Sequence, residues 1–139
     1  MRLAKLGRLL RIAGLMRMLR LVRVLEEVAE MHLSEGCRLV TRLLSLFMVI
    51  LWATHLLACL WFAIGTGAPS DTGHRWTDFM GYETQLGGPD FQSLTRFYQY
   101  MVSFHWAAGQ IALGSIDVAP TNSWERVVFV LAMLFGFLF

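Results

Sequence analysis

Basic residues recur at every third position through the first 25 residues, and no acidic residue appears before Glu26. Such groups can pair with acidic side chains, with anionic lipid headgroups or with nucleic-acid phosphates. The basic series therefore has three common interpretations: a transit peptide, a basic amphipathic helix lying on lipid, and a nucleic-acid-binding arm. The series consists of Arg2, Lys5, Arg8, Arg11, Arg17, Arg20 and Arg23, with Gly14 in its gap.

The three-residue spacing decides which helix these charges suit. On an α-helix each step falls about 60° short of a full turn, so the charges wind around the cylinder and leave no clean apolar face. On a 3₁₀ helix they form one stripe. In bare lipid the series would cost roughly 17–25 kcal/mol, which the intervening leucines do not offset. We therefore expect acidic partners on helices that precede Met1.

A second pattern, over residues 94–126, predicts a helix, an outward turn and a new helix. Apolar and aromatic residues recur at steps of three and four and predict a helix over 94–111. The period then fails, and turn-forming and polar residues follow. Asn122 stands three residues before Glu125 and predicts a capped helix start. The turn contains Gly114, Ser115, Asp117 and Pro120.

These residues resemble the pore region of six-helix voltage-gated-like cation channels, and most of all the cyclic-nucleotide-gated and ether-à-go-go-like branch. The resemblance implies a pore helix whose negative carboxyl end faces the ion, and rings of backbone carbonyls that replace the ion's water. It also implies four copies of the chain, a homotetramer. It rests on Phe104, His105 and Trp106, the sequence ALGSIDVAP at 112–120, Thr121, Asn122, Glu125 and Arg126. The implied selectivity filter is Ala112, Leu113, Gly114, Ser115, Ile116 and Asp117.

The filter departs from the potassium-channel pattern Thr-Val-Gly-Tyr-Gly-Asp. Ala112 lacks the hydroxyl that supplies an ion ligand, and β-branched Ile116 replaces the second glycine. The cation path through this filter is expected to be either potassium-selective or non-selective. A third alternative is that the loop conducts no ions. Asp117 in four copies would attract cations and repel anions. Its ordinary alternative is a turn aspartate that bonds its own backbone.

Composition indicates a membrane protein. The 139 residues are 56% hydrophobic and 16% charged, with a mean hydropathy of +0.53. No phosphate-binding glycine loop and no nucleophile with a suitably spaced His or acid is present, so an enzyme has no support. Cys37 and Cys59 lack metal spacing. We expect no metal site, no cofactor beyond permeant monovalent cations, and no nucleic-acid partner; a cyclic-nucleotide-binding region would lie beyond Phe139.

The uncharged run from Leu43 to Ile64 predicts a transmembrane helix. Its 22 residues would span about 33 Å as a helix, which matches the bilayer core. Arg38 and Arg42 precede it and an acid-rich segment follows, so its amino-terminal side is expected in the cytoplasm. The chain is thus expected to be an integral, multi-pass membrane protein whose partner is the lipid bilayer.

Residues 54–65 resemble the outer pore helix of the same channel branch. His55 is either a proton-sensitive or ligand site, or a neutral side chain bonded to a neighbouring helix. Trp61 and Phe62 are expected in the outer aromatic belt. The polar stretch that follows is expected to form a solvated outer turret, in which His74 has no partner spacing for a metal.

The same resemblance implies that the basic series is the family's voltage-sensing helix, so the predicted fold class is an all-α membrane protein with a voltage-sensor helix and a two-helix pore module carrying a re-entrant loop. The basic helix would move in the membrane field, a linker containing Glu26, Glu27 and Glu30 would pass the motion on, and cations would cross the filter. Two alternatives stay open: a non-conducting paralogue, and a membrane-anchored protein that binds lipid or a partner. The sequence is expected to be a piece of a longer chain. Its expected segments are 1–25 (sensor), 26–42 (linker), 43–66 (outer helix), 67–93 (turret), 94–111 (pore helix), 112–120 (filter) and 122–139 (start of the inner helix).

Overall fold

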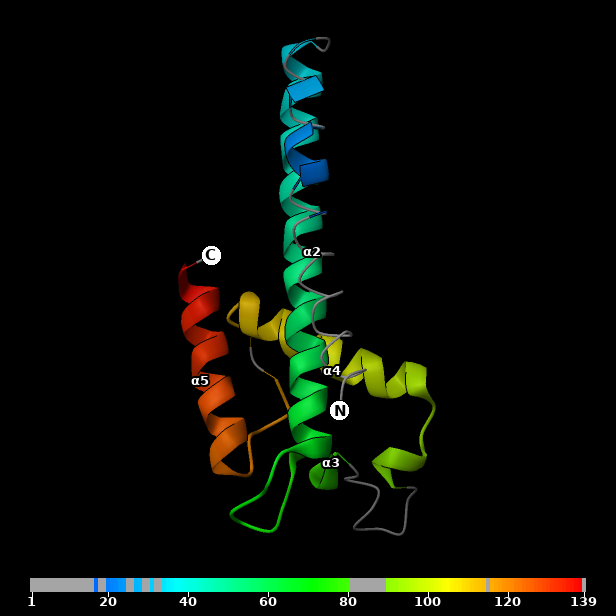
Figure 1. The fold of residues 1–139 in the computed structure, drawn as a ribbon, viewed down its shortest axis with the longest axis vertical. Coiled ribbons are helices and arrows are strands. Elements are labelled where there is room, and N and C mark those ends of the chain that lie inside the picture. Colours follow the sequence, from blue (N-terminus) through cyan, green and yellow to red (C-terminus); the bar gives the residue numbers. More distant parts are fainter. Residues whose placement is uncertain are drawn as a thin grey trace. The chain divides into compact units, whose positions relative to one another are not determined.

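The computed structural model describes residues 17, 20–24, 27–28, 31, 34–80, 90–114 and 116–138. Of these residues 78% are helical and none lies in a strand, so the predicted all-α class is confirmed for the described part of the chain. The chain divides into two compact units, Met1–Leu51 and Trp52–Phe139. Figure 1 shows the ribbon with its labelled helices.

The first unit carries the end of the basic series. Arg17, Arg20 and Arg23 have helical backbone and exposed side chains, and residues 20–24 are α-helical rather than 3₁₀. Glu27 is also helical and exposed. The remaining predicted sensor and linker residues lie outside the described residues: Arg2, Lys5, Arg8, Arg11, Glu26 and Glu30.

Helix α2 runs over Glu35–Gly67 and belongs to both units. Its 33 residues correspond to about 50 Å. It begins where Ser34 leaves helical geometry, as the sequence predicted, and continues through positions 35–42 that were expected to be linker. Within the described residues it is the one helix long and apolar enough to cross a membrane, with a mean hydropathy of 2.2 over its best window.

The core of the second unit is built from aromatic rings on four elements. Trp61 on α2 stacks on Trp106 of α4, which spans Arg96–Ile111; their centroids are 3.8 Å apart and their planes 6° from parallel. Trp76 of α3 (Trp76–Phe79) covers the other side of Trp61 at 5.6 Å. Phe91 of the 3₁₀ helix η2 (Phe91–Ser93) meets Trp76 edge-on. All four rings are at most 1% exposed, and such burial of aromatic surface dominates core energetics.

The buried position of Trp61 corrects the sequence prediction. Trp61 was expected in the outer aromatic belt, yet it is fully buried. The sequence of one helix gives only the position of the tryptophan along it. The packing of α3 and α4 decides that the Trp61 ring is covered from two sides. Phe62 beside it is half-buried.

The segment after α2 folds back onto the end of that helix. The Arg75 guanidinium donates to the carbonyl oxygens of Thr66 and Ala68, at 2.9 and 3.2 Å, and so satisfies carbonyls that a helix end leaves unpaired. A side chain on Gly65 would collide with the Trp76 indole. The predicted turret is therefore anchored through buried Trp76, Thr77 and Phe91 instead of being solvated throughout; its positions 81–89 lie outside the described residues.

Candidate functional site

Helix α4 is fixed at its amino end by its own side chains. Thr95 is the N-cap and accepts a hydrogen bond from the Tyr98 backbone N–H. The buried Gln99 amide nitrogen donates to three carbonyl oxygens of the incoming chain at 3.0 to 3.1 Å. The helix predicted over 94–111 is confirmed, with its start at Arg96.

Trp106 places α4 between the two long apolar helices of the second unit. One side of its ring stacks on Trp61 of α2. Phe129 of α5, which spans Ser123–Leu138, lies 6.2 Å from it, centroid to centroid. Figure 1 shows α5 running opposite in direction to the carboxyl-terminal half of α2, with α4 lying across the direction of both.

The carboxyl end of α4 packs against the carboxyl-terminal part of α5. A side chain on Gly136 would collide with the Gln110 carbonyl oxygen and would lie 3.2 Å from the Ile111 Cα atom. The absence of a side chain on Gly136 therefore allows this backbone approach. Isolated glycines inside a helical pattern signal such a packing reason, but the sequence did not identify its partner.

The chain reverses directly after this contact. The Ala112 N–H still bonds to the Ala108 carbonyl oxygen, and Leu113 takes a φ of +52°, in the left-handed region. The Gly114 N–H then closes the turn on the Gly109 carbonyl oxygen at 2.8 Å. Leu113 therefore holds a backbone conformation that residues with a side chain rarely adopt.

The residues after the reversal return toward the start of α5. Ile116 is half-buried and packs over Gly109, where any side chain would collide with it. Val118 is buried. Residues 112–122 therefore cover the distance from Gly136 back to Ser123, about 20 Å along α5.

Five of the six predicted filter residues can be placed, and Ser115 lies outside the described residues. Ala112, Leu113, Gly114 and Asp117 are exposed. Asp117 is the one acidic side chain among them. It borders a hollow of about 190 Å³ lined by Trp76, Phe79, Met80, Val118, Ala119 and Thr121.

Glu125 anchors the end of the return segment, a role the sequence only partly indicated. The Asn122 side chain caps α5 by accepting from the Glu125 N–H at 3.0 Å, as predicted. The Glu125 carboxylate is fully buried. Instead of completing a capping box with the Asn122 backbone, the Glu125 carboxylate accepts three other hydrogen bonds. Their donors are the Thr121 backbone N–H, the Thr121 hydroxyl and the Trp76 backbone N–H, at 2.8, 3.0 and 3.1 Å. The acid therefore ties the return segment to α3.

Asp71 provides a second, exposed tie at the start of α5. Its carboxylate accepts from the hydroxyl and from the backbone N–H of Ser123. These two bonds, the side-chain bond first, lower the pKa of Asp71 below its ordinary value. Thr72 adds a bond from its hydroxyl to the Thr121 carbonyl oxygen at 3.1 Å.

His55 joins α2 to α4. Its Nδ1 atom lies 3.0 Å from the Tyr100 hydroxyl, and its Nε2 atom lies 3.7 Å from the Cys59 sulfur. The interpretation of His55 as a residue bonded to a neighbouring helix is confirmed. Within the described residues no group of three or more His, Cys, Asp or Glu side chains could hold a metal ion.

Comparison with known proteins gives no assignment for this site. No family model, no curated protein and no solved structure matches the chain.

Proposed function

We propose that this chain is the pore-forming part of a voltage-gated-like monoatomic cation channel. One observation carries the proposal: a 16-residue helix packs between two apolar helices, ends against the second of them, and the chain then reverses toward the start of that second helix. A membrane anchor has no need of this hairpin. A re-entrant pore loop has this form because it must hold backbone carbonyls inside the membrane while its ends stay on one side.

The surface of the second unit fits assembly around an axis. Ala112, Leu113 and Gly114 are exposed in the single chain. Helix α5 also exposes large apolar side chains, among them Val127, Val130, Leu131, Met133, Leu134 and Phe137. A single filter segment cannot enclose an ion, so four copies would bring these segments together while lipid and neighbouring subunits cover the apolar faces.

The basic helix supplies the proposed voltage dependence. Arg17, Arg20 and Arg23 are helical and exposed. Each full charge that crosses the membrane field contributes about 2.3 kcal/mol per 100 mV. The linker that contains Glu26, Glu27 and Glu30 would transmit this motion to the pore.

The test is to express the gene that encodes this chain and to record currents under voltage clamp while sodium, potassium and calcium are exchanged. We expect a cation current that rises with depolarisation or hyperpolarisation. Absence of current with protein at the cell surface would contradict permeation and favour the non-conducting paralogue, the alternative that Ala112 and Ile116 keep open.

Asp117 offers a sharper test of the ion path. Asp117→Asn removes one charge per chain from the return segment, so the preference for cations over anions and the single-channel conductance should both fall. Asp90→Asn is the matched control because Asp90 is also exposed but precedes η2. Equal effects of the two variants would show that Asp117 does not line the path.

A further inference from the structure

Two neighbouring cavities lie between the carboxyl-terminal half of α2 and the amino-terminal half of α4. The larger, about 240 Å³, is lined by Phe62, Thr66, Phe91, Gln92, Arg96 and Gln99. The smaller, about 170 Å³, is lined by Ala58, Cys59, Phe62, Arg96, Gln99, Tyr100 and Ser103. Phe62, Arg96 and Gln99 border both cavities, so the two adjoin, and we refer to them together as the cleft.

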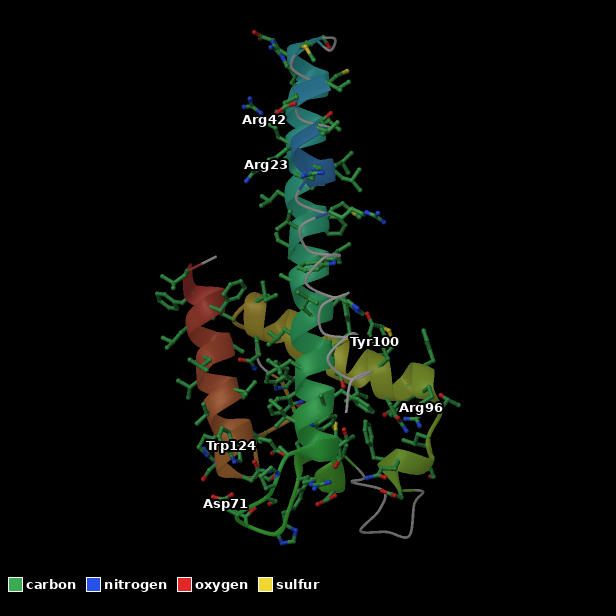
Figure 2. The ribbon with its side chains drawn as sticks, in the orientation of Figure 1. Arg23, Arg42, Asp71, Arg96, Tyr100 and Trp124 are labelled. Atoms are coloured by element: carbon green, nitrogen blue, oxygen red, sulfur yellow. The ribbon has the colours of Figure 1, made fainter. Side chains whose placement is uncertain are left out.

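The cleft is polar at one end and apolar at the other. Thr66, Gln92, Arg96 and Gln99 gather at the end nearest the last turn of α2. Eight residues earlier on the same helix, about 12 Å along its axis, the wall is Ala58 and its neighbour Cys59. Figure 2 shows Arg96 nearer the amino end of α4 and Tyr100 further along it.

Arg96 carries a charge that the described residues do not neutralise. Its guanidinium donates to the Gln99 side-chain oxygen at 3.3 Å. No carboxylate among the described residues lies within 4.0 Å of the Arg96 guanidinium. The Gln99 amide nitrogen is already bonded to three carbonyl oxygens. The remaining guanidinium donors are suited to an anionic oxygen, for which arginine has a geometric preference.

We infer that this cleft binds an anionic phospholipid of the surrounding membrane, with its phosphate on Arg96 and one acyl chain between Cys59, Phe62 and Tyr100. The inference depends on the membrane placement in the proposed function, but not on ion conduction. Charge complementarity selects the headgroup, and the apolar end of the cleft accepts the chain. The direction agrees with a bilayer: the polar end lies at the end of the apolar helix, and the apolar end lies toward its middle.

The binding test uses the full chain reconstituted in vesicles of phosphatidylcholine with phosphatidylglycerol, then extracted gently for native mass spectrometry. Phosphatidylglycerol should be retained preferentially, and Arg96→Gln should reduce its retention at least about tenfold, as loss of a charge-assisted bond implies. Arg38→Gln is the matched control because Arg38 also lies on a helix exposed to solvent or lipid but borders neither cavity.

A second variant tests the acyl-chain half of the site. Cys59→Phe fills the apolar end and should also lower retention, whereas added inorganic phosphate should not displace the lipid. Equal retention by wild type and Arg96→Gln would overturn the inference. Loss in Arg96→Gln without loss in Cys59→Phe, or displacement by phosphate, would likewise overturn it by showing headgroup binding outside the cleft. Currents recorded from the Arg96→Gln variant test the proposed channel function independently of lipid retention. A current in this variant would show that the channel function stands whether or not the lipid binds.

Discussion

Trp61 and Trp106 lie face to face, with ring centroids 3.8 Å apart and both side chains fully buried. The first belongs to the long apolar helix α2 and the second to the middle of α4. The stack therefore sets where α4 meets α2. Because Phe129 lies against Trp106 from α5, the same ring also relates α4 to the third helix.

Loss of this ring should destabilise the second unit strongly. Trp106→Ala should lower the free energy of unfolding by about 3–5 kcal/mol, because it removes a large buried ring and leaves a cavity. Denaturant unfolding in detergent, followed by fluorescence, measures it. Trp124→Ala is the control because Trp124 is 58% exposed on α5, and its loss should cost far less. Similar values for the two variants would mean that the stack does not hold α4.

Gly136 should not accept even a methyl group. In Gly136→Ala the new carbon meets the Gln110 carbonyl oxygen and the Ile111 Cα atom, so the end of α4 must move away from α5. We expect a loss of about 1–3 kcal/mol in thermal unfolding, together with loss of current in a conducting channel.

The control for Gly136 is Gly36→Ala in the first turn of α2, where nothing lies within 4 Å of the added carbon. That change should be neutral or stabilising by up to about 1 kcal/mol, because alanine favours the helix more than glycine. Tolerance of Gly136→Ala would contradict the close approach of the two helix ends.

Glu125→Gln should weaken the tie between the return segment and α3. The amide keeps one acceptor oxygen but turns an NH₂ group toward a buried N–H donor, which leaves polar groups unpaired at a cost of about 1–3 kcal/mol. Chemical unfolding gives the value. Glu35→Gln removes the same charge where the side chain is 95% exposed, and such surface pairs contribute less than about 1 kcal/mol. A Glu125→Gln cost no larger than that of Glu35→Gln would be inconsistent with the buried network.

Asp71 should give the fold a dependence on acidic pH. Its pKa lies below the ordinary value of 3.8 because Ser123 donates two hydrogen bonds to the ionised form. Its contribution to stability is therefore complete above that ordinary pKa, and it is lost as the pH falls through the lower pKa of the folded state.

The measurement compares unfolding midpoints of wild type and Asp71→Asn between pH 6 and pH 2. Wild type should be the more stable at pH 6, and the two proteins should converge on acidification. Asp90→Asn removes another exposed carboxylate and serves as the control. A constant difference between wild type and Asp71→Asn across this range would indicate that the bonds to Ser123 do not depend on ionisation.

Local sequence patterns determined most of the helices. The three- and four-residue period of α4, the uncharged run of α2, the Ser34 boundary and the Asn122 cap each depend on residues close together in the chain, and the structure has all of them. The same is true of the turn after Ile111, because Gly114 and Pro120 oppose a continuing helix.

Only the tertiary structure decided which side chains those helices bring together. Trp61 is a core residue rather than a belt residue because α3 and α4 cover it, and Glu125 bonds to Trp76, 49 positions away. Gly136 meets Gln110, and Arg96 shares a cleft with Cys59, for the same reason. Periodicity records which face of a helix is apolar, but the partner of that face depends on packing between segments that the sequence separates.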